Sequence, residues 1–124
     1  MSTMLARVSA WLLATVIVVL SLVSPQERPV VAPHVLEHAG IFLALGAAAA
    51  LAYPRRHRVA LALAAFCGAV EWAQVWAAGR HARVSDLIVD IAASLSGVAA
   101  VALAAQWRRR SIARAGACRD KTSS

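Results

Sequence analysis

The feature that most constrains this chain is an uncharged run from Val8 to Gln26, between Arg7 and Glu27. A helix needs about 20 consecutive, mostly apolar residues to cross the hydrocarbon core of a bilayer. The whole sequence fits that reading, because 60% of its 124 residues are hydrophobic and 15% are charged. Soluble domains average about 45–50% apolar and 25% charged residues. A soluble fold of this size could not bury so many apolar side chains, so we expect an integral membrane protein.

Three further apolar runs predict spans at about residues 33–53, 59–78 and 85–107. Pro33 suits a first helical turn, Pro54 and the basic run 55–58 end the second span, Gly79 ends the third, and Ser85 or Asp86 is expected to cap the fourth. Because the loops are short, neighbouring helices should be antiparallel. The sequence therefore predicts an all-α bundle of four transmembrane helices. A cleaved signal peptide is the competing interpretation of the first run, but cleavage after Ser24 would put Leu22 where a small residue is preferred.

This reading divides the chain into three parts. Residues 1–33 form the first transmembrane helix and an outer loop, residues 34–107 a core of three transmembrane helices, and residues 108–124 a basic tail that we expect to be disordered. All of the 13 Lys and Arg residues except Arg28, Arg80 and Arg83 fall on one side of the predicted bundle. By the positive-inside rule that side is cytoplasmic. We therefore expect a multi-pass protein of the inner (plasma) membrane with both termini in the cytoplasm.

The net charge of +7 does not point to nucleic acid, because the basic residues flank apolar runs. The expected partners are membrane lipids, and nothing indicates a cofactor. Cys67 lies within a span and Cys118 in the tail, so we expect no disulfide between them. Small residues suited to close helix approach are Gly46, Gly68, Ala93 and Gly97.

Polar residues gather at the predicted outer ends of the spans. They are Glu37, His38, Glu71, Gln74, Arg80, His81, Arg83, Asp86 and Asp90. Glu71 and Gln74 share one helix face, as do Asp86 and Asp90. Glu71 should lie about 10 Å below the surface, where a carboxylate is costly and marks a candidate functional site. We expect His38 or Arg80 to be its partner. The alternative is a purely structural polar staple that locks the bundle.

The stretch 33-PHVLEHAG-40 also spells H-x-x-E-H through His34, Glu37 and His38. That pattern occurs in zinc peptidases, and Glu71 could add a third ligand. Zinc needs a third protein ligand at a fixed spacing, and such peptidases are larger enzymes with room for a substrate cleft. We therefore expect no metal site, and we interpret the spelling as the polar start of a helix.

The residues 38-HAGIF-42, 55-RRHR-58, 71-EWAQ-74, 79-GR-80, 85-SD-86 and 93-ASLSG-97 resemble, in this order, the VanZ-like family of small membrane proteins. The resemblance covers about residues 34 to 105. It implies a membrane protein of the cell envelope, linked through its namesake to resistance to the glycopeptide teicoplanin, and no settled reaction comes with it. Matched by motif, it carries over His38, Glu71, Gln74, Arg80 and Asp86 as site residues. Two positions depart from the family pattern: His34 stands where an Asp is usual, and Asp90 where an Asn is usual.

Three classes of function remain open. The first is an outer-leaflet site, including Asp90, that binds the headgroup of a lipid or a cell-wall precursor, with Arg80 and Arg83 holding phosphate. The second is a membrane enzyme in which His38 and Glu71 act as general base and acid on a lipid-linked substrate. The third is a small structural partner of other envelope proteins. The sequence does not indicate the oligomeric state.

Overall fold

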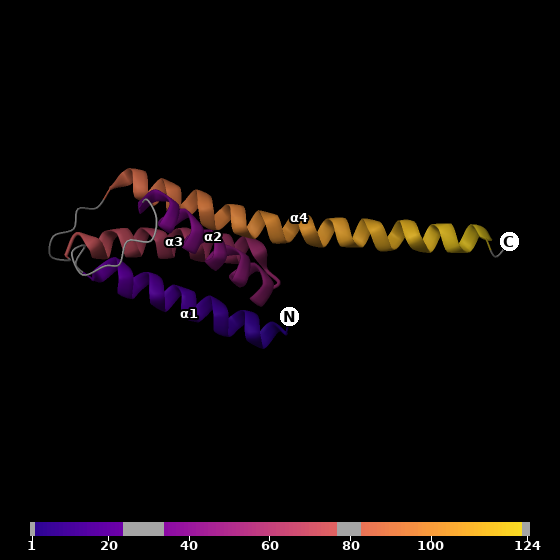
Figure 1. Cartoon of the computed structure of the whole chain (residues 1–124), viewed down its shortest axis with the longest axis horizontal. Coiled ribbons are helices and arrows are strands. Elements are labelled where there is room, and N and C mark those ends of the chain that lie inside the picture. The colour runs from indigo at the N-terminus through magenta and orange to yellow at the C-terminus, as the bar shows by residue number, and fades with distance from the viewer. Residues whose placement is uncertain (1, 24–33, 77–82, 123–124) are drawn as a thin grey trace.

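The computed structural model describes residues 2–23, 34–76 and 83–122, and its regular elements are all α-helices. They are α1 (Thr3–Leu22), α2 (His34–Ala52), α3 (Arg56–Gln74) and α4 (Val84–Thr122). Consecutive helices run in opposite directions, so α2 and α4 are parallel to each other and antiparallel to α1 and α3 (Figure 1). The all-helical prediction is confirmed for the described residues.

Three helical stretches are long and apolar enough to cross a membrane: Thr3–Leu22, Val35–Ala52 and Val84–Gly116. The third predicted span, 59–78, corresponds to α3, which is not among them. The uncharged part of α3 lies between Arg58 and Glu71, and the helix ends at Gln74. That part is shorter than the roughly 20 residues a span needs. Residues 77 and 78 of the predicted span lie outside the described residues, as do Pro33 and Gly79.

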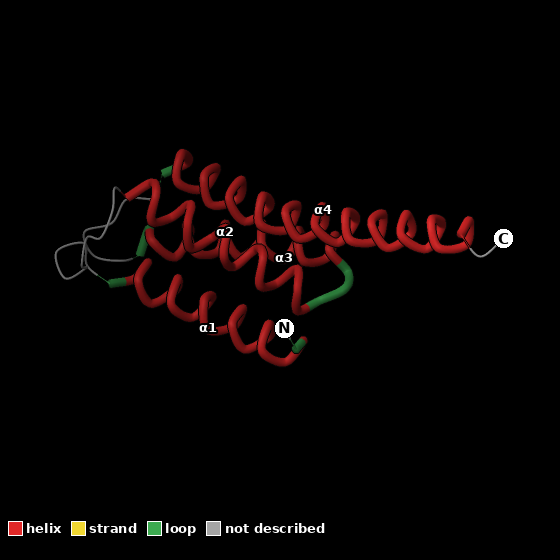
Figure 2. Tube along the Cα trace, turned by 45° about the vertical axis from the view of Figure 1, so that its right-hand side comes forward, coloured by secondary structure: helices red, strands yellow, loops and turns green. Residues whose placement is uncertain are grey.

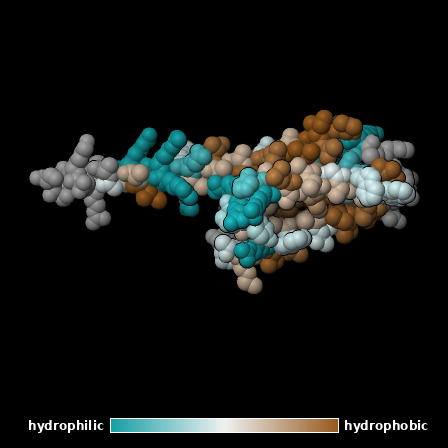
Figure 3. Space-filling model, turned by 180° about the vertical axis from the view of Figure 1, so that it is seen from behind, coloured by the Kyte–Doolittle hydropathy of each residue, from teal (hydrophilic) through white to brown (hydrophobic). Residues whose placement is uncertain are grey.

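Most of the apolar surface of the helices faces outward. In the most apolar stretch of each helix of spanning length, only 22% is buried in α1 and in α4, and 44% in α2. Large side chains such as Trp11, Leu61 and Leu103 are exposed, and apolar surface covers much of the bundle (Figure 3). Exposed apolar surface of this extent marks contact with a partner or a membrane. Because it accompanies helices of spanning length, it supports a membrane protein.

The helix ends follow local chemistry, with one correction. The side chain of Ser2 caps α1 by accepting a hydrogen bond from the N–H of Leu5 at 3.3 Å. Pro54 follows α2 closely and cannot continue a helical hydrogen-bond ladder. At the start of α4, Ser85 and Asp86 were predicted as caps, but the helix begins at Val84. Both residues therefore lie inside the first turn, where the Asp86 carboxylate complements the helix dipole.

The basic tail is a second correction. Residues 108–124 were predicted to be disordered, but α4 continues as one helix through Thr122. The tail is rich in Arg and Ala, which are strong helix formers, and it contains no Pro. At 1.5 Å per residue, α4 is about 60 Å long. Its C-terminal part extends well beyond the other helices (Figure 1).

The closest helix approach is between α2 and α4. A Cβ added at Gly46 would lie 2.0 Å from the carbonyl oxygen of Ser94, and one at Gly97 would lie 2.2 Å from that of Leu43. Only glycine fits at these two positions, which confirms their predicted packing role. Gly68 was predicted to serve the same role, but a Cβ there would meet nothing within 4 Å. No backbone of a neighbouring helix approaches this position closely, so that prediction is wrong.

The bundle has two chemically different ends. The polar end contains the last turns of α1 and α3 and the first turns of α2 and α4. The arginine end contains the first turns of α1 and α3 and the last turn of α2, with the short turn that joins α2 to α3 (Figure 2). Between the two ends lies a core of mostly apolar side chains, in which Ile17, Phe42 and Cys67 are almost completely buried.

Candidate functional site

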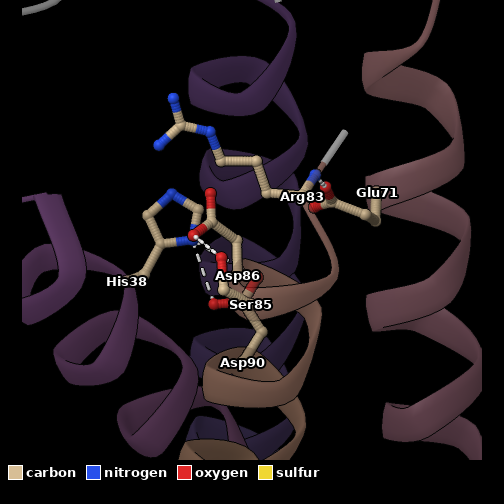
Figure 4. A network of polar contacts seen from close by, with 6 residues as sticks. All are labelled: His38, Glu71, Arg83, Ser85, Asp86 and Asp90. Atoms are coloured by element: carbon tan, nitrogen blue, oxygen red, sulfur yellow. Dashed lines mark hydrogen bonds and ion pairs between the residues drawn. The ribbon is translucent and has the colours of Figure 1, made fainter. Parts of the chain in front are cut away.

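A histidine and an aspartate meet inside the polar end. The Nδ1 atom of His38 on α2 lies 3.0 Å from Oδ1 and 3.3 Å from Oδ2 of Asp90 on α4. His38 is 6% exposed and Asp90 is 2% exposed. A carboxylate this deeply buried is tolerated only when it is paired. The His38–Asp90 contact therefore ties the first turns of α2 to the first turns of α4 (Figure 4).

The glycine crossing sets this contact in place. Asp90 lies one turn before Ser94, whose backbone contacts Gly46, and Ser94 itself is completely buried. The Ser94 hydroxyl donates to the carbonyl oxygen of Ile91, one turn earlier in α4, at 3.0 Å. With the two backbones touching, a short side chain such as Asp90 is long enough to reach α2. The local sequence 93-ASLSG-97 thus supplies both the close approach and the register of the pair.

Glu71 binds the start of α4. Its Oε1 atom accepts a hydrogen bond from the backbone N–H of Arg83, the residue just before Val84. Backbone N–H groups at the start of a helix have no partner within the helix. A carboxylate at that place supplies one and also complements the positive end of the helix dipole. Glu71 therefore caps α4 from a neighbouring helix, which fixes α3 against α4 at the polar end.

Two buried polar atoms next to this contact have no hydrogen-bond partner among the described residues. They are Oε2 of Glu71 and Nε2 of Gln74. Glu71 is 7% exposed and Gln74 is 3% exposed, and both lie on the same face of α3. Leaving such a group unsatisfied costs about 1–3 kcal/mol, more for a charged one. Within the described residues, one buried acceptor and one buried donor on the same face of α3 are therefore available to a further partner.

Further ionisable side chains lie close to Glu71. Asp86, Asp90 and His38 all lie near enough to Glu71 to interact with its charge. The Asp86 carboxylate is half-buried and accepts a long hydrogen bond of 3.4 Å from the Ser85 hydroxyl. Figure 4 shows these side chains converging from three helices.

The structure brings most of the predicted site together but pairs it differently. His38, Glu71, Gln74, Asp86 and Asp90 lie at the polar end, as expected. Of the two expected partners of Glu71, His38 contacts Asp90 instead and Arg80 is not described, while Glu71 accepts a hydrogen bond from the backbone N–H of Arg83. The carboxylate of Asp90 is thus the described partner of His38 in this pairing. Arg80 and His81 lie outside the described residues.

Two contributions could not be predicted from residue types. The N–H of Arg83 is a backbone group, which every residue except proline carries, so no motif announces it. For Ser94, the sequence indicated only a small residue near Gly97, not its backbone contact with Gly46. The H-x-x-E-H pattern raised the question of a metal site. The described residues contain no group of three or more His, Cys, Asp or Glu side chains placed to hold a metal ion. The side chain of His34 is not among those described.

No family model, curated protein or solved structure matches this chain. The function must therefore be inferred from the geometry and chemistry of the polar end.

Proposed function

We propose that this chain is a four-span protein of the inner membrane, with both termini in the cytoplasm. Three helices of spanning length and an outward apolar surface support this. The fourth span would be α3. Its uncharged part is short, but Glu71 and Gln74 are buried inside the bundle and so need not face the lipid. The concentration of Arg and Lys at the arginine end supports a cytoplasmic location for that end. The polar end then lies in the outer leaflet.

We further propose that this chain is a VanZ-like protein whose polar end binds the headgroup of a lipid-linked molecule of the cell envelope, such as a cell-wall precursor. The observation that carries this proposal is that two buried atoms on one face of α3, Glu71 Oε2 and Gln74 Nε2, have no hydrogen-bond partner among the described residues. A structural staple would satisfy its own polar atoms, because each unsatisfied one is destabilising. Glu71 Oε2 can accept a hydrogen bond from a bound molecule, and Gln74 Nε2 can donate one to it.

Their chemistry specifies the ligand. Glu71 Oε2 is an acceptor, so the ligand must present a hydroxyl, amide or ammonium hydrogen. Gln74 Nε2 is a donor, so the ligand must also present an oxygen. Asp86 and Asp90 make the surroundings acidic, which disfavours a ligand with only negative groups at this point. A sugar or peptide headgroup carries both kinds of group, and its phosphate would be left to Arg80 and Arg83.

The test is retention of envelope lipids by purified protein. Wild type, Glu71→Gln and Gln74→Glu are incubated in detergent with a lipid extract of the source membrane, and bound species are identified by native mass spectrometry. Glu71→Gln leaves Oε1 to accept from Arg83 but converts the Oε2 acceptor into a donor. Gln74→Glu converts the Nε2 donor into an acceptor. We expect wild type to retain a headgroup-bearing lipid, and each variant to lose it by about tenfold or more, as expected for a hydrogen bond to a charged group.

Glu37→Gln is the matched control for Glu71→Gln. It makes the same change of charge in the first turn of α2, at the same end of the bundle. It should retain the lipid as wild type does. Equal retention by wild type, Glu71→Gln and Glu37→Gln would contradict the proposed site and leave the polar end as a structural feature.

A second candidate function is a membrane enzyme acting on the same class of molecule. The His38–Asp90 contact favours it, because a carboxylate on Nδ1 holds the proton there and makes Nε2 the basic nitrogen. Turnover of an envelope lipid by wild type but not by His38→Asn would support an enzyme. Binding without turnover would leave a headgroup-binding protein.

A further inference from the structure

A groove of about 670 Å³ opens at the arginine end, opposite the polar end. It lies between the first turns of α1, the last turns of α2, the start of α3 and the middle of α4. We call it the arginine groove. Its lining residues that matter here are Arg7, Arg56, Arg108, Tyr53, Val101 and Ala104.

The groove combines an apolar wall with a basic rim. Small apolar residues from the end of α2 and the middle of α4, including Ala50 and Val101, form the wall. Three arginines, from α1, α3 and α4, form the rim: Arg7, Arg56 and Arg108. Hydrophilic surface gathers where α4 leaves the bundle, beside the apolar surface of the helices (Figure 3).

The rim is ordered by contacts within the protein. The Arg7 guanidinium stacks over the Tyr53 ring, 5.5 Å from its centroid. Tyr53 in turn accepts a hydrogen bond from Nε1 of Trp11 at 3.3 Å. An arginine held this way loses less side-chain freedom when it binds a ligand than an unrestrained one.

The rim charges are not neutralised by acidic neighbours in the groove. The chain has six acidic residues, and those whose side chains the structure describes do not line the groove. Four of them, Glu37, Glu71, Asp86 and Asp90, belong to the polar end. Three arginines on a groove without a carboxylate form a site for a phosphate-bearing group.

We propose that the arginine groove binds one anionic phospholipid, with its phosphate on the rim and an acyl chain along the apolar wall. Basic pockets between membrane helices on the cytoplasmic side bind such headgroups, and an apolar wall suits a lipid rather than a free ion. The proposal rests on the membrane insertion proposed above, but it concerns a different site, a different ligand and the opposite leaflet from the headgroup site.

The test compares neighbouring arginines. Wild type, Arg56→Gln and Arg55→Gln are placed in nanodiscs of phosphatidylcholine containing phosphatidylglycerol, then released into detergent for native mass spectrometry. Arg56 lines the groove, whereas the adjacent Arg55 is exposed and does not. We expect Arg56→Gln to retain about fivefold less phosphatidylglycerol than wild type, the contribution of one arginine near a membrane surface. Arg55→Gln should retain as much as wild type.

A second pair of variants tests the wall without changing charge. Ala104→Phe fills the groove, whereas Ala99→Phe places the same ring on an exposed part of α4 outside it. Ala104→Phe should lower phosphatidylglycerol retention and Ala99→Phe should not. Glu71→Gln should leave this retention unchanged, which separates the two sites.

The last part of the test adds inorganic phosphate as a competitor for the bound lipid. At millimolar concentration it should fail to displace the retained phosphatidylglycerol, because it cannot use the apolar wall. The proposal is overturned if phosphate displaces the lipid fully, if phosphatidylcholine is retained equally well, or if Arg56→Gln and Arg55→Gln behave alike.

Discussion

Both ends of the bundle contain clustered charged side chains, but these are largely buried at the polar end and lie on an open rim at the arginine end. At the polar end the charges are mainly acidic, and His38, Glu71 and Asp90 are buried between helices. At the arginine end the charges are basic and lie on an open rim. A buried charge is costly unless it is paired, whereas a charge on a rim keeps its contact with water or headgroups. Substitutions that break buried pairs at the polar end should therefore change the stability of the fold, whereas substitutions on the rim of the arginine end should change mainly lipid binding.

The largest effect on stability should come from breaking the buried pair. Asp90→Ala removes the partner of His38 and leaves a cavity at a site that is 2% exposed. Removing one member of a buried ion pair costs about 3–5 kcal/mol. We expect a loss of that size in the free energy of unfolding, measured by denaturant titration in detergent micelles.

Two controls make this expectation specific. Replacing both partners, in His38→Leu with Asp90→Leu, should recover most of the loss, because no unpaired polar group then remains. Asp86→Ala, one turn away and half-buried, should cost only about 0.3–1 kcal/mol from the lost interaction with the helix dipole. An equal cost for Asp86→Ala and Asp90→Ala would show that the buried pair is not special.

The next largest effect should come from the glycine crossing that holds the polar end in register. In Gly97→Ala the new Cβ would lie 2.2 Å from a backbone oxygen of α2. The two helices must move apart, at a cost of about 1–3 kcal/mol. Gly68→Ala is the matched control, because its Cβ meets nothing within 4 Å. It should stabilise the protein by about 0.5–1 kcal/mol, since alanine is the better helix residue. Equal changes in the two unfolding titrations would contradict the close crossing.

The smallest effect should be found at the arginine end. Tyr53→Phe removes the hydroxyl that accepts from Trp11 across an exposed contact of 3.3 Å. The ring that Arg7 stacks on stays in place. We expect a loss of about 0.5 kcal/mol, at the low end for a single hydrogen bond. A loss comparable with that of Asp90→Ala would remove the contrast between the two ends.

The sequence predicted much of the fold because hydropathy and helix ends are local properties. The uncharged run 8–26, Pro54 and the run 55–58 gave the helices and their order. The tail was misjudged because its charge suggested disorder, whereas its arginines and alanines favour a helix. The third span, 59–78, stays a prediction, because Glu71 lies inside it and its last two residues lie outside the described part of the chain.

The site was predicted in membership but not in pairing. Helical spacing places residues at a depth and on a face, so His38, Glu71 and Asp90 could be expected at one end. It does not give the rotation of one helix against another, which here depends on the contact of Gly46 with the backbone of Ser94. That contact brings Asp90, rather than Glu71, to His38. The hydrogen bond that Arg83 donates to Glu71 comes from a backbone N–H, which the residue type does not predict.

The most direct test of the central claim is the unfolding midpoint of wild type and of Glu71→Gln, each with and without lipid extract. A ligand that binds the folded state raises the midpoint. We predict that wild type rises with the extract and that Glu71→Gln does not. Without extract, Glu71→Gln should be at least as stable as wild type, because a neutral amide costs less to bury than a carboxylate. An equal rise in both proteins, or no rise in either, would contradict a ligand site at Glu71.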